Sequence, residues 1–167
     1  MSDLRLKPSQ IDERRFVTTY GGVYEHSPHF AKAVWANVPH HQLDTVDDLA
    51  HALKAAVDAA GKPSQLALIR AHPDLADRVK MSAKSVSEQS GAGLDNCSAE
   101  ELAEFRSLNA AYKARFGFPF IKAVRGFSRG EILAEFRRRA GNDPDTEFAT
   151  ALAEIHKIAR LRLGDLA

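Results

Sequence analysis

The sequence predicts an all-α protein, a single-domain helical bundle of about six to eight helices over residues 1–167. Apolar residues recur at helical spacing in one segment after another, most of these segments have capping residues at their ends, and strand-like alternation is nearly absent. The 167 residues are 44% hydrophobic, which suffices for one compact core and is short for two. No internal repeat or low-complexity linker indicates a second domain.

Two short amphipathic helices are expected near the start of the chain. Ser9 is placed to cap a helix over residues 10–20, which a pair of glycines ends. Ser27 precedes a proline that opens a second helix over residues 28–37, because proline is favoured in the first turn.

The next two expected helices have clearer ends. Thr45, with Asp48 three residues later, makes a near capping box for a helix over residues 46–60. A further apolar segment over residues 63–71 runs into a histidine that precedes Pro73. Proline disfavours the α conformation in the residue before it, so this helix should stop near residue 71. The histidine then lies at a helix end, facing a cavity or solvent.

The second half of the chain contains longer helical patterns. Three helices are expected, over residues 99–115, 129–140 and 144–163. Ser98 and Glu101 form a capping box for the first, Ser128 can cap the second, and Asp143 with Pro144 starts the third. The apolar face of the first is assigned to Leu102, Phe105, Leu108, Ala111 and Tyr112.

Composition and charge narrow the classes of partner. Lys and Arg number 23 against 22 Asp and Glu, so the formal charge of +1 provides no basic field to attract nucleic acid or an anionic membrane. The single Cys97 cannot form an intramolecular disulfide, which is typical of a reducing compartment. With a polar N-terminus and no long apolar stretch, we expect a cytoplasmic protein without nucleic-acid or membrane partners.

The candidate site lies where the helical periodicity is interrupted. His72, Pro73 and Asp74 follow the fourth expected helix, and the polar loop over residues 77–96 contains Glu88. Loops on a rigid scaffold can aim polar groups into a cavity. A carboxylate beside an imidazole raises the histidine pKa toward neutral pH, so His72 and Glu88 are predicted as an acid–base pair. The alternatives are a structural histidine and a solvated carboxylate, while Asp74 is expected to cap the turn.

Segment 116–126 is also unusual, with three phenylalanines around glycine and proline. It predicts a buried, kinked connection, and its backbone N–H and C=O groups beside apolar rings would suit a flat ring rich in heteroatoms. Residues 137–139, all arginine, are expected to form a solvated helix face. Arg160 and Arg162 lie among apolar positions, so at least one is expected to point inward and to bind an anion. No metal site is expected, because the histidine pairs lack a convincing third ligand.

Several motifs in order along the chain together resemble the OHCU decarboxylase family, where OHCU is 2-oxo-4-hydroxy-4-carboxy-5-ureidoimidazoline. They occupy residues 72–76, 85–94, 108–112, 116–121 and 158–163. The resemblance covers nearly the whole chain, and the motifs together are far more specific than any one of them.

The resemblance implies an all-α homodimer that converts OHCU to (S)-allantoin in urate breakdown, without a cofactor or metal. It maps the catalytic acid onto His72 and its partner onto Glu88. It also implies substrate contacts from these residues: Pro73, Ser85, Val86, Ser87, Gln89, Phe120, Ile121, Lys122, Ala123, Val124 and Arg162. Arg160 lies close to the matched arginine and competes with it for the anion-binding role.

Two other interpretations stay open at this point. The His72-Pro73-Asp74 tripeptide after a helix superficially resembles the chaperone-binding J-domain, although a tripeptide is weak evidence. A decarboxylase or hydrolase of a related ureide would use the same pocket, and the sequence does not separate it from an OHCU decarboxylase.

Overall fold

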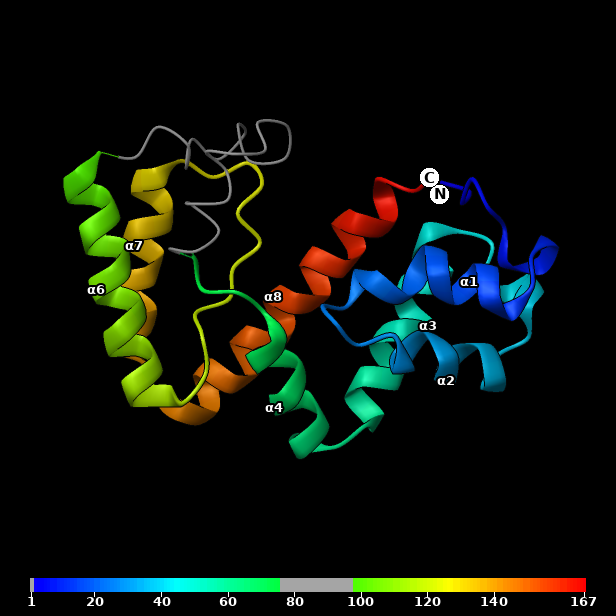
Figure 1. Cartoon of the computed structure of the whole chain (residues 1–167), viewed down its shortest axis with the longest axis horizontal. Coiled ribbons are helices and arrows are strands. Elements are labelled where there is room, and N and C mark those ends of the chain that lie inside the picture. The colour runs from blue at the N-terminus through cyan, green and yellow to red at the C-terminus, as the bar shows by residue number, and fades with distance from the viewer. Residues whose placement is uncertain (1, 76–97) are drawn as a thin grey trace. The chain divides into compact units, whose positions relative to one another are not determined.

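The computed structural model describes residues 2–75 and 98–167 of the chain (Figure 1). Within these residues it contains seven α-helices, three short 3-10 helices, and no strand pairing beyond one isolated bridge between Asp3 and Thr45. The all-α fold predicted from the sequence is therefore confirmed. In the described part, no helix combines the length and the apolar character needed to cross a membrane.

The chain divides into two compact units, and the division falls within the last helix, α8 (Pro144–Gly164). The first unit comprises Met1–Ala71 and Ile155–Ala167, and the second comprises His72–Glu154. One domain over residues 1–167 stays a prediction.

In the first unit, four helices precede the C-terminal part of α8. They are α1 (Glu13–Tyr20), α2 (His29–Asn37), α3 (Val46–Ala59) and α4 (Lys62–Ala71). Short 3-10 segments lie at Pro8–Gln10, Gly21–Val23 and His40–Gln42. The core is formed by side chains at helical spacing, among them Phe16, Tyr20, Leu49, Leu53 and Val57, none of them more than 1% exposed.

The first two helices start differently from the prediction. Ser9 caps no helix, because its hydroxyl donates to Asp44 across 2.6 Å. Helix α1 begins four residues later behind Asp12, whose carboxylate accepts a backbone N–H of the first turn at 2.8 Å. Helix α2 begins at His29, one residue after the proline that was expected to open it, and the Ser27 hydroxyl donates to a backbone carbonyl two residues earlier. No side chain caps α2, whereas at the start of α1 the contact of Ser9 with Asp44 leaves the cap to Asp12.

The later helix starts agree with the prediction. Thr45 caps α3 by accepting the backbone N–H three residues later at 3.1 Å. Ser98 opens α6 (Ala99–Phe116) and Ser128 opens α7 (Arg129–Ala140). Each serine forms a reciprocal capping box with the glutamate three residues later, so two backbone N–H groups are satisfied at the N-terminus of each of these two helices.

The second unit is built around α6 and α7, which lie side by side (Figure 1). Gly117 ends α6 with a φ of +77°, a left-handed conformation that glycine adopts readily, and the chain turns back there. Phe120 in the returning segment packs against Tyr112 of α6 at 5.6 Å and stacks on Phe136 of α7 at 3.9 Å. This aromatic contact holds the connection between the two helices.

One surface prediction is wrong for one of its three residues. Arg137 and Arg138 are exposed as expected, but Arg139 is 1% exposed and points into the core of the second unit. Its Nε donates to Glu147 at 3.0 Å and its Nη1 donates to the carbonyl of Ile121 at 2.7 Å. Position 139 follows a buried phenylalanine by three residues, so it shares that helix face. Because residues 137–139 are all arginine, their residue types do not indicate which of them falls on the buried face of the helix.

Candidate functional site

His72 lies immediately after α4, which ends at Ala71 as the following proline predicts. The residue is 7% exposed, so it is buried and does not face solvent. Two residues later, the Asp74 carboxylate accepts from Lys113 of α6 at 3.3 Å, which ties this turn to α6. The residues that Asp74 was expected to cap lie outside the described part of the chain.

The predicted substrate-contacting segment, residues 120–124, is buried. The expectation of a buried connection over residues 116–126 is therefore confirmed for its middle, whereas Gly117, Arg125 and Gly126 are exposed. The five residues of the segment, Phe120, Ile121, Lys122, Ala123 and Val124, are each at most 9% exposed. The segment has no regular secondary structure. Its backbone polar groups therefore need partners other than a ladder of backbone hydrogen bonds.

Two glutamates on α8 supply partners for this segment. Glu147 and Glu154 are seven residues apart, about two turns, and therefore lie on one helix face. Glu154 accepts the backbone N–H of Ala123 at 3.3 Å, and the same carboxylate lies 3.8 Å from the Nζ of Lys122. Glu147 acts through Arg139, which donates to a backbone carbonyl of the segment. The segment is thus fixed by two buried carboxylates.

The Glu147 carboxylate is itself fully engaged. The Tyr112 hydroxyl donates to Oε1 at 2.5 Å, and the Asn142 amide donates to Oε2 at 3.0 Å. Burial, followed by the hydrogen bond and the charge of Glu147, raises the pKa of Tyr112, so its hydroxyl remains a donor at neutral pH. Such additional hydrogen bonds are what allow the attraction between Arg139 and Glu147 to offset the cost of burying both charges.

The two arginines of the last helix are both paired. Arg160 is exposed and pairs with Asp47. Arg162 is half-buried, as expected for one of the two, and donates to Glu25 at 2.8 Å and to the carbonyls of Gly22 and Val23 at 3.3 Å. The acidic partner of Arg162 is distant in sequence, so an inward arginine here does not by itself require an anionic ligand.

The predicted site residues are distributed over different parts of the structure. His72, Pro73 and segment 120–124 belong to the second unit, whereas Arg162 belongs to the first. Outside the described residues lie Ser85, Val86, Ser87, Glu88, Gln89 and Cys97. Among described residues, no three His, Cys, Asp or Glu side chains gather as metal ligands would.

The family of the chain follows from its similarity to known proteins. The family model described as OHCU decarboxylase matches residues 9–164. This chain belongs to the OHCU decarboxylase family. The predicted enzyme class, a carbon–carbon lyase that removes a carboxyl group, is thereby confirmed.

Individual relatives agree with the family model. The chain is 42% identical over 166 residues to the 2-oxo-4-hydroxy-4-carboxy-5-ureidoimidazoline decarboxylase of Haloferax volcanii, with 99% of this chain and 97% of that protein covered. A crystal structure of (S)-allantoin synthase matches with a TM-score of 0.77 and 34% identity, covering 93% of this chain and 50% of that one. A crystal structure of OHCU decarboxylase in the presence of (S)-allantoin matches with a TM-score of 0.69 and 26% identity, covering 93% and 98%.

Three polar residues that the sequence did not indicate are buried in the second unit of this OHCU decarboxylase family member. On α6, Ala111 was assigned to the apolar face but is exposed, and Asn109 is buried instead. Glu147 and Glu154 were also not considered. The one feature of the sequence that could have indicated them is their spacing, because two acidic residues seven positions apart fall on one helix face among apolar neighbours. The pattern of apolar residues alone does not indicate that they are buried.

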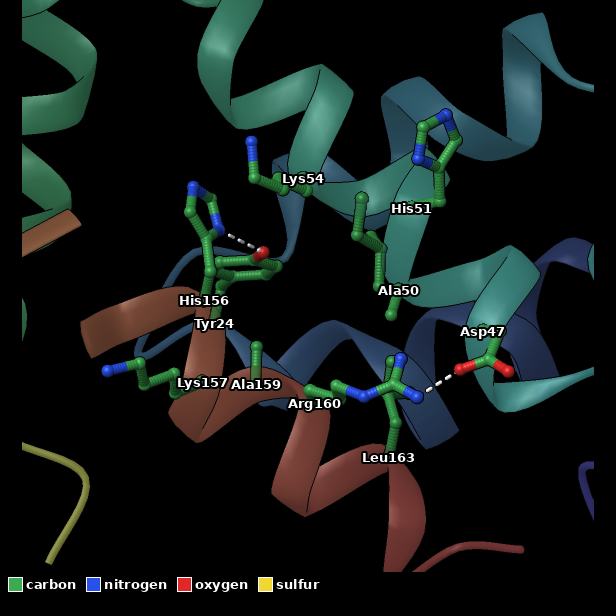
Figure 2. Close-up of a pocket in the computed structure, with 11 residues that line it drawn as sticks. Tyr24, Asp47, Ala50, His51, Lys54, His156, Lys157, Ala159, Arg160 and Leu163 are labelled. Atoms are coloured by element: carbon green, nitrogen blue, oxygen red, sulfur yellow. Dashed lines mark hydrogen bonds and ion pairs between the residues drawn. The ribbon is translucent and has the colours of Figure 1, made fainter. Parts of the chain in front are cut away.

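A separate hollow of about 390 Å³ lies in the first unit of the OHCU decarboxylase chain, between α3 and the end of α8 (Figure 2). Figure 2 shows the Tyr24 hydroxyl and the His156 ring turned toward each other; they are 2.7 Å apart. The other ring nitrogen of His156 lies 3.2 Å from Asp58. Among the described residues considered for the site, Arg160 lines this hollow, whereas His72, segment 120–124 and Arg162 do not. The Tyr-His-Asp chain ties three segments of the first unit together.

The Tyr-His-Asp chain predicts a loss of stability at mildly acidic pH. Burial lowers the pKa of His156, although Asp58 opposes this. Because the unfolded histidine has a pKa of about 6.5, the unfolded chain binds more protons below that pH than the folded protein does. The contribution of His156 to the free energy of unfolding should therefore fall as the pH drops from about 7.5 through 6.5 toward the folded pKa.

Urea denaturation of wild type and His156→Gln at several pH values checks this expectation. The variant should lose stability less steeply between about pH 7.5 and 5.5 than the wild type does. His51→Gln, at an exposed position on α3, serves as the control and should retain the wild-type slope. Equal slopes for wild type and His156→Gln would contradict the prediction.

Proposed function

We propose that this chain decarboxylates OHCU to (S)-allantoin in urate breakdown, with His72 as the general acid and Glu88 as its partner. The observation that carries the substrate assignment is the family match over nearly the whole chain. The His72 imidazole is buried, and it lies in the same compact unit as the buried, irregular segment 120–124. Both observations support His72 as the general acid. A cytoplasmic location and a homodimer remain predictions.

The substrate itself can accept the electrons that the reaction releases. When carbon dioxide leaves, the bonding pair stays on the ring carbon that carries the hydroxyl. The adjacent conjugated C=N takes up this pair, its nitrogen is protonated by water, and the result is an enol-like intermediate. In other decarboxylases, pyridoxal or thiamine supplies such an electron sink. Because this substrate contains its own, the proposed reaction needs no cofactor of this kind.

Three tasks then remain for the protein. It orients the carboxylate out of the plane of the ring π system, and it holds the reacting group in a poorly solvated pocket. It also delivers one proton to one face of the ureido-bearing carbon as the hydroxyl becomes a carbonyl. In the proposal, His72 delivers this proton, while Glu88 orients the imidazole or accepts the hydrogen bond of the substrate hydroxyl.

Substrate contacts are proposed for the remaining predicted residues. In segment 120–124 these contacts use the backbone, because the Lys122 ammonium lies 3.8 Å from Glu154 and 3.8 Å from the centre of the Phe127 ring. Arg162 is proposed to contact the anionic substrate with donors beyond those bound to Glu25, since a guanidinium carries five N–H groups.

Circular dichroism during coupled turnover tests the proposed function. Uricase and the preceding hydrolase generate OHCU, and the protein is added as it forms. We expect faster formation of allantoin and a growing signal of the S enantiomer, because protonation within a chiral pocket selects one face. Racemic product formed at the spontaneous rate would refute the proposal, and a different optically active product would favour a related ureide as the substrate.

A further inference from the structure

Asn109 is a buried amide without a hydrogen-bond partner in the described part of the chain. The residue is 3% exposed, and neither its Nδ2 nor its Oδ1 is bonded. Buried polar side chains nearly always have partners, because an unpaired amide loses its hydration without compensation. No described residue of the free protein therefore accounts for the burial of the Asn109 amide.

The other unpaired buried atom among the described residues has a local explanation. It is the Nη2 of Arg139. That guanidinium already donates through Nε and Nη1, and it lies 4.3 Å from the centre of the Phe120 ring. Arg139 is thus bound on several sides, whereas the Asn109 side chain makes no hydrogen bond with any described residue.

Neighbouring positions on α6 place Asn109 close to both parts of the proposed site. Tyr112, three residues later, packs against Phe120 of the substrate-contacting segment. Lys113, four residues later, binds Asp74 in the turn that contains the proposed acid. Residues three and four apart share a helix face at a rise of about 5.4 Å per turn. Asn109 is therefore one turn away from the two points where α6 touches these segments, all within the second unit.

An asparagine side chain is chemically complementary to a urea group. Its Nδ2 donates and its Oδ1 accepts, so the two atoms can pair with the C=O and the N–H of a ureide in one plane. OHCU and allantoin both carry such a group. We infer that Asn109 is a substrate-binding residue that pairs with the ureide N–H and C=O of the substrate. This inference rests on the proposed function, and it assigns to Asn109 the selection of ureides over ring compounds that lack this donor and acceptor pair.

The variant Asn109→Leu tests this role, because leucine has the same branching and the same number of side-chain heavy atoms but no polar atom. Replacing an unpaired buried amide by an apolar group should leave the melting temperature of the free protein unchanged or raise it. The affinity for (S)-allantoin, measured by calorimetric titration, should fall at least about tenfold because two hydrogen bonds are lost. The kcat/KM for OHCU should fall by a similar factor.

Ile132→Val is the matched control, because Ile132 is a fully buried residue of α7 in the same unit. It should lower the melting temperature slightly and leave allantoin affinity unchanged. A melting temperature of Asn109→Leu below that of the control would show that the amide has a partner in the free protein, and would overturn the inference. Unchanged allantoin affinity in Asn109→Leu would overturn it as well. Failure of the proposed function is distinguishable, because the wild type itself would then not decarboxylate OHCU.

Discussion

The variant His72→Asn should decarboxylate OHCU about 10²–10⁴-fold more slowly than the wild type while remaining folded. Asparagine occupies a similar volume to histidine and retains a donor, but it cannot release a proton near neutral pH. If His72 supplies the proton to the ureido-bearing carbon, the small amount of allantoin that the variant forms should also be close to racemic. Coupled circular dichroism measures both the rate and the enantiomeric excess.

Two further variants make this experiment specific. Glu88→Ala should also lose rate, because the imidazole loses its partner or the substrate hydroxyl loses its acceptor. His41→Asn, at an exposed position in a 3-10 segment of the first unit, should behave as the wild type does. Near-normal turnover with the S enantiomer by His72→Asn would refute the catalytic role of His72.

The fold was predictable from the sequence wherever its cause is local. A helix start capped by serine with a glutamate three residues later depends on four consecutive residues, and Ser98 and Ser128 cap as predicted. Ser9 fails as a cap because its hydroxyl meets Asp44, which is 35 residues away. Competition between caps is decided by such tertiary contacts, which the sequence pattern does not contain.

The candidate site was predictable only in part, for a related reason. Motifs identified His72 and segment 120–124, and both prove to be buried. The partners that hold the segment were not predicted, because their contacts are not local in sequence. Glu154 lies 31 positions from Ala123, and Arg139, which pairs with Glu147, lies 18 positions from Ile121. Polar side chains in a core are exceptions to the apolar pattern, so periodicity assigns them to the surface.

The same buried network should dominate the stability of the second unit. Arg139→Met removes the guanidinium and leaves Glu147 as a fully buried carboxylate that keeps two hydrogen-bond donors, Tyr112 and Asn142, but has lost its ion-pair partner. Breaking one partner of a buried ion pair costs about 3–5 kcal/mol, so we expect a loss of this size in the free energy of unfolding. The Ile121 carbonyl also loses its donor, which adds to the effect. Urea denaturation measures the change.

Arg138, the adjacent residue, provides a matched control. It also forms an ion pair, with its Nη2 at 2.6 Å from the Glu135 carboxylate, but its guanidinium is exposed. Arg138→Met should cost far less than Arg139→Met, since water screens an exposed pair. The double variant Arg139→Met with Glu147→Leu should recover much of the loss, because it removes both buried charges together. If Arg139→Met and Arg138→Met were equally stable, the Arg139–Glu147 pair would not be what holds segment 120–124, and the aromatic contacts of Phe120 would have to hold it without the pair.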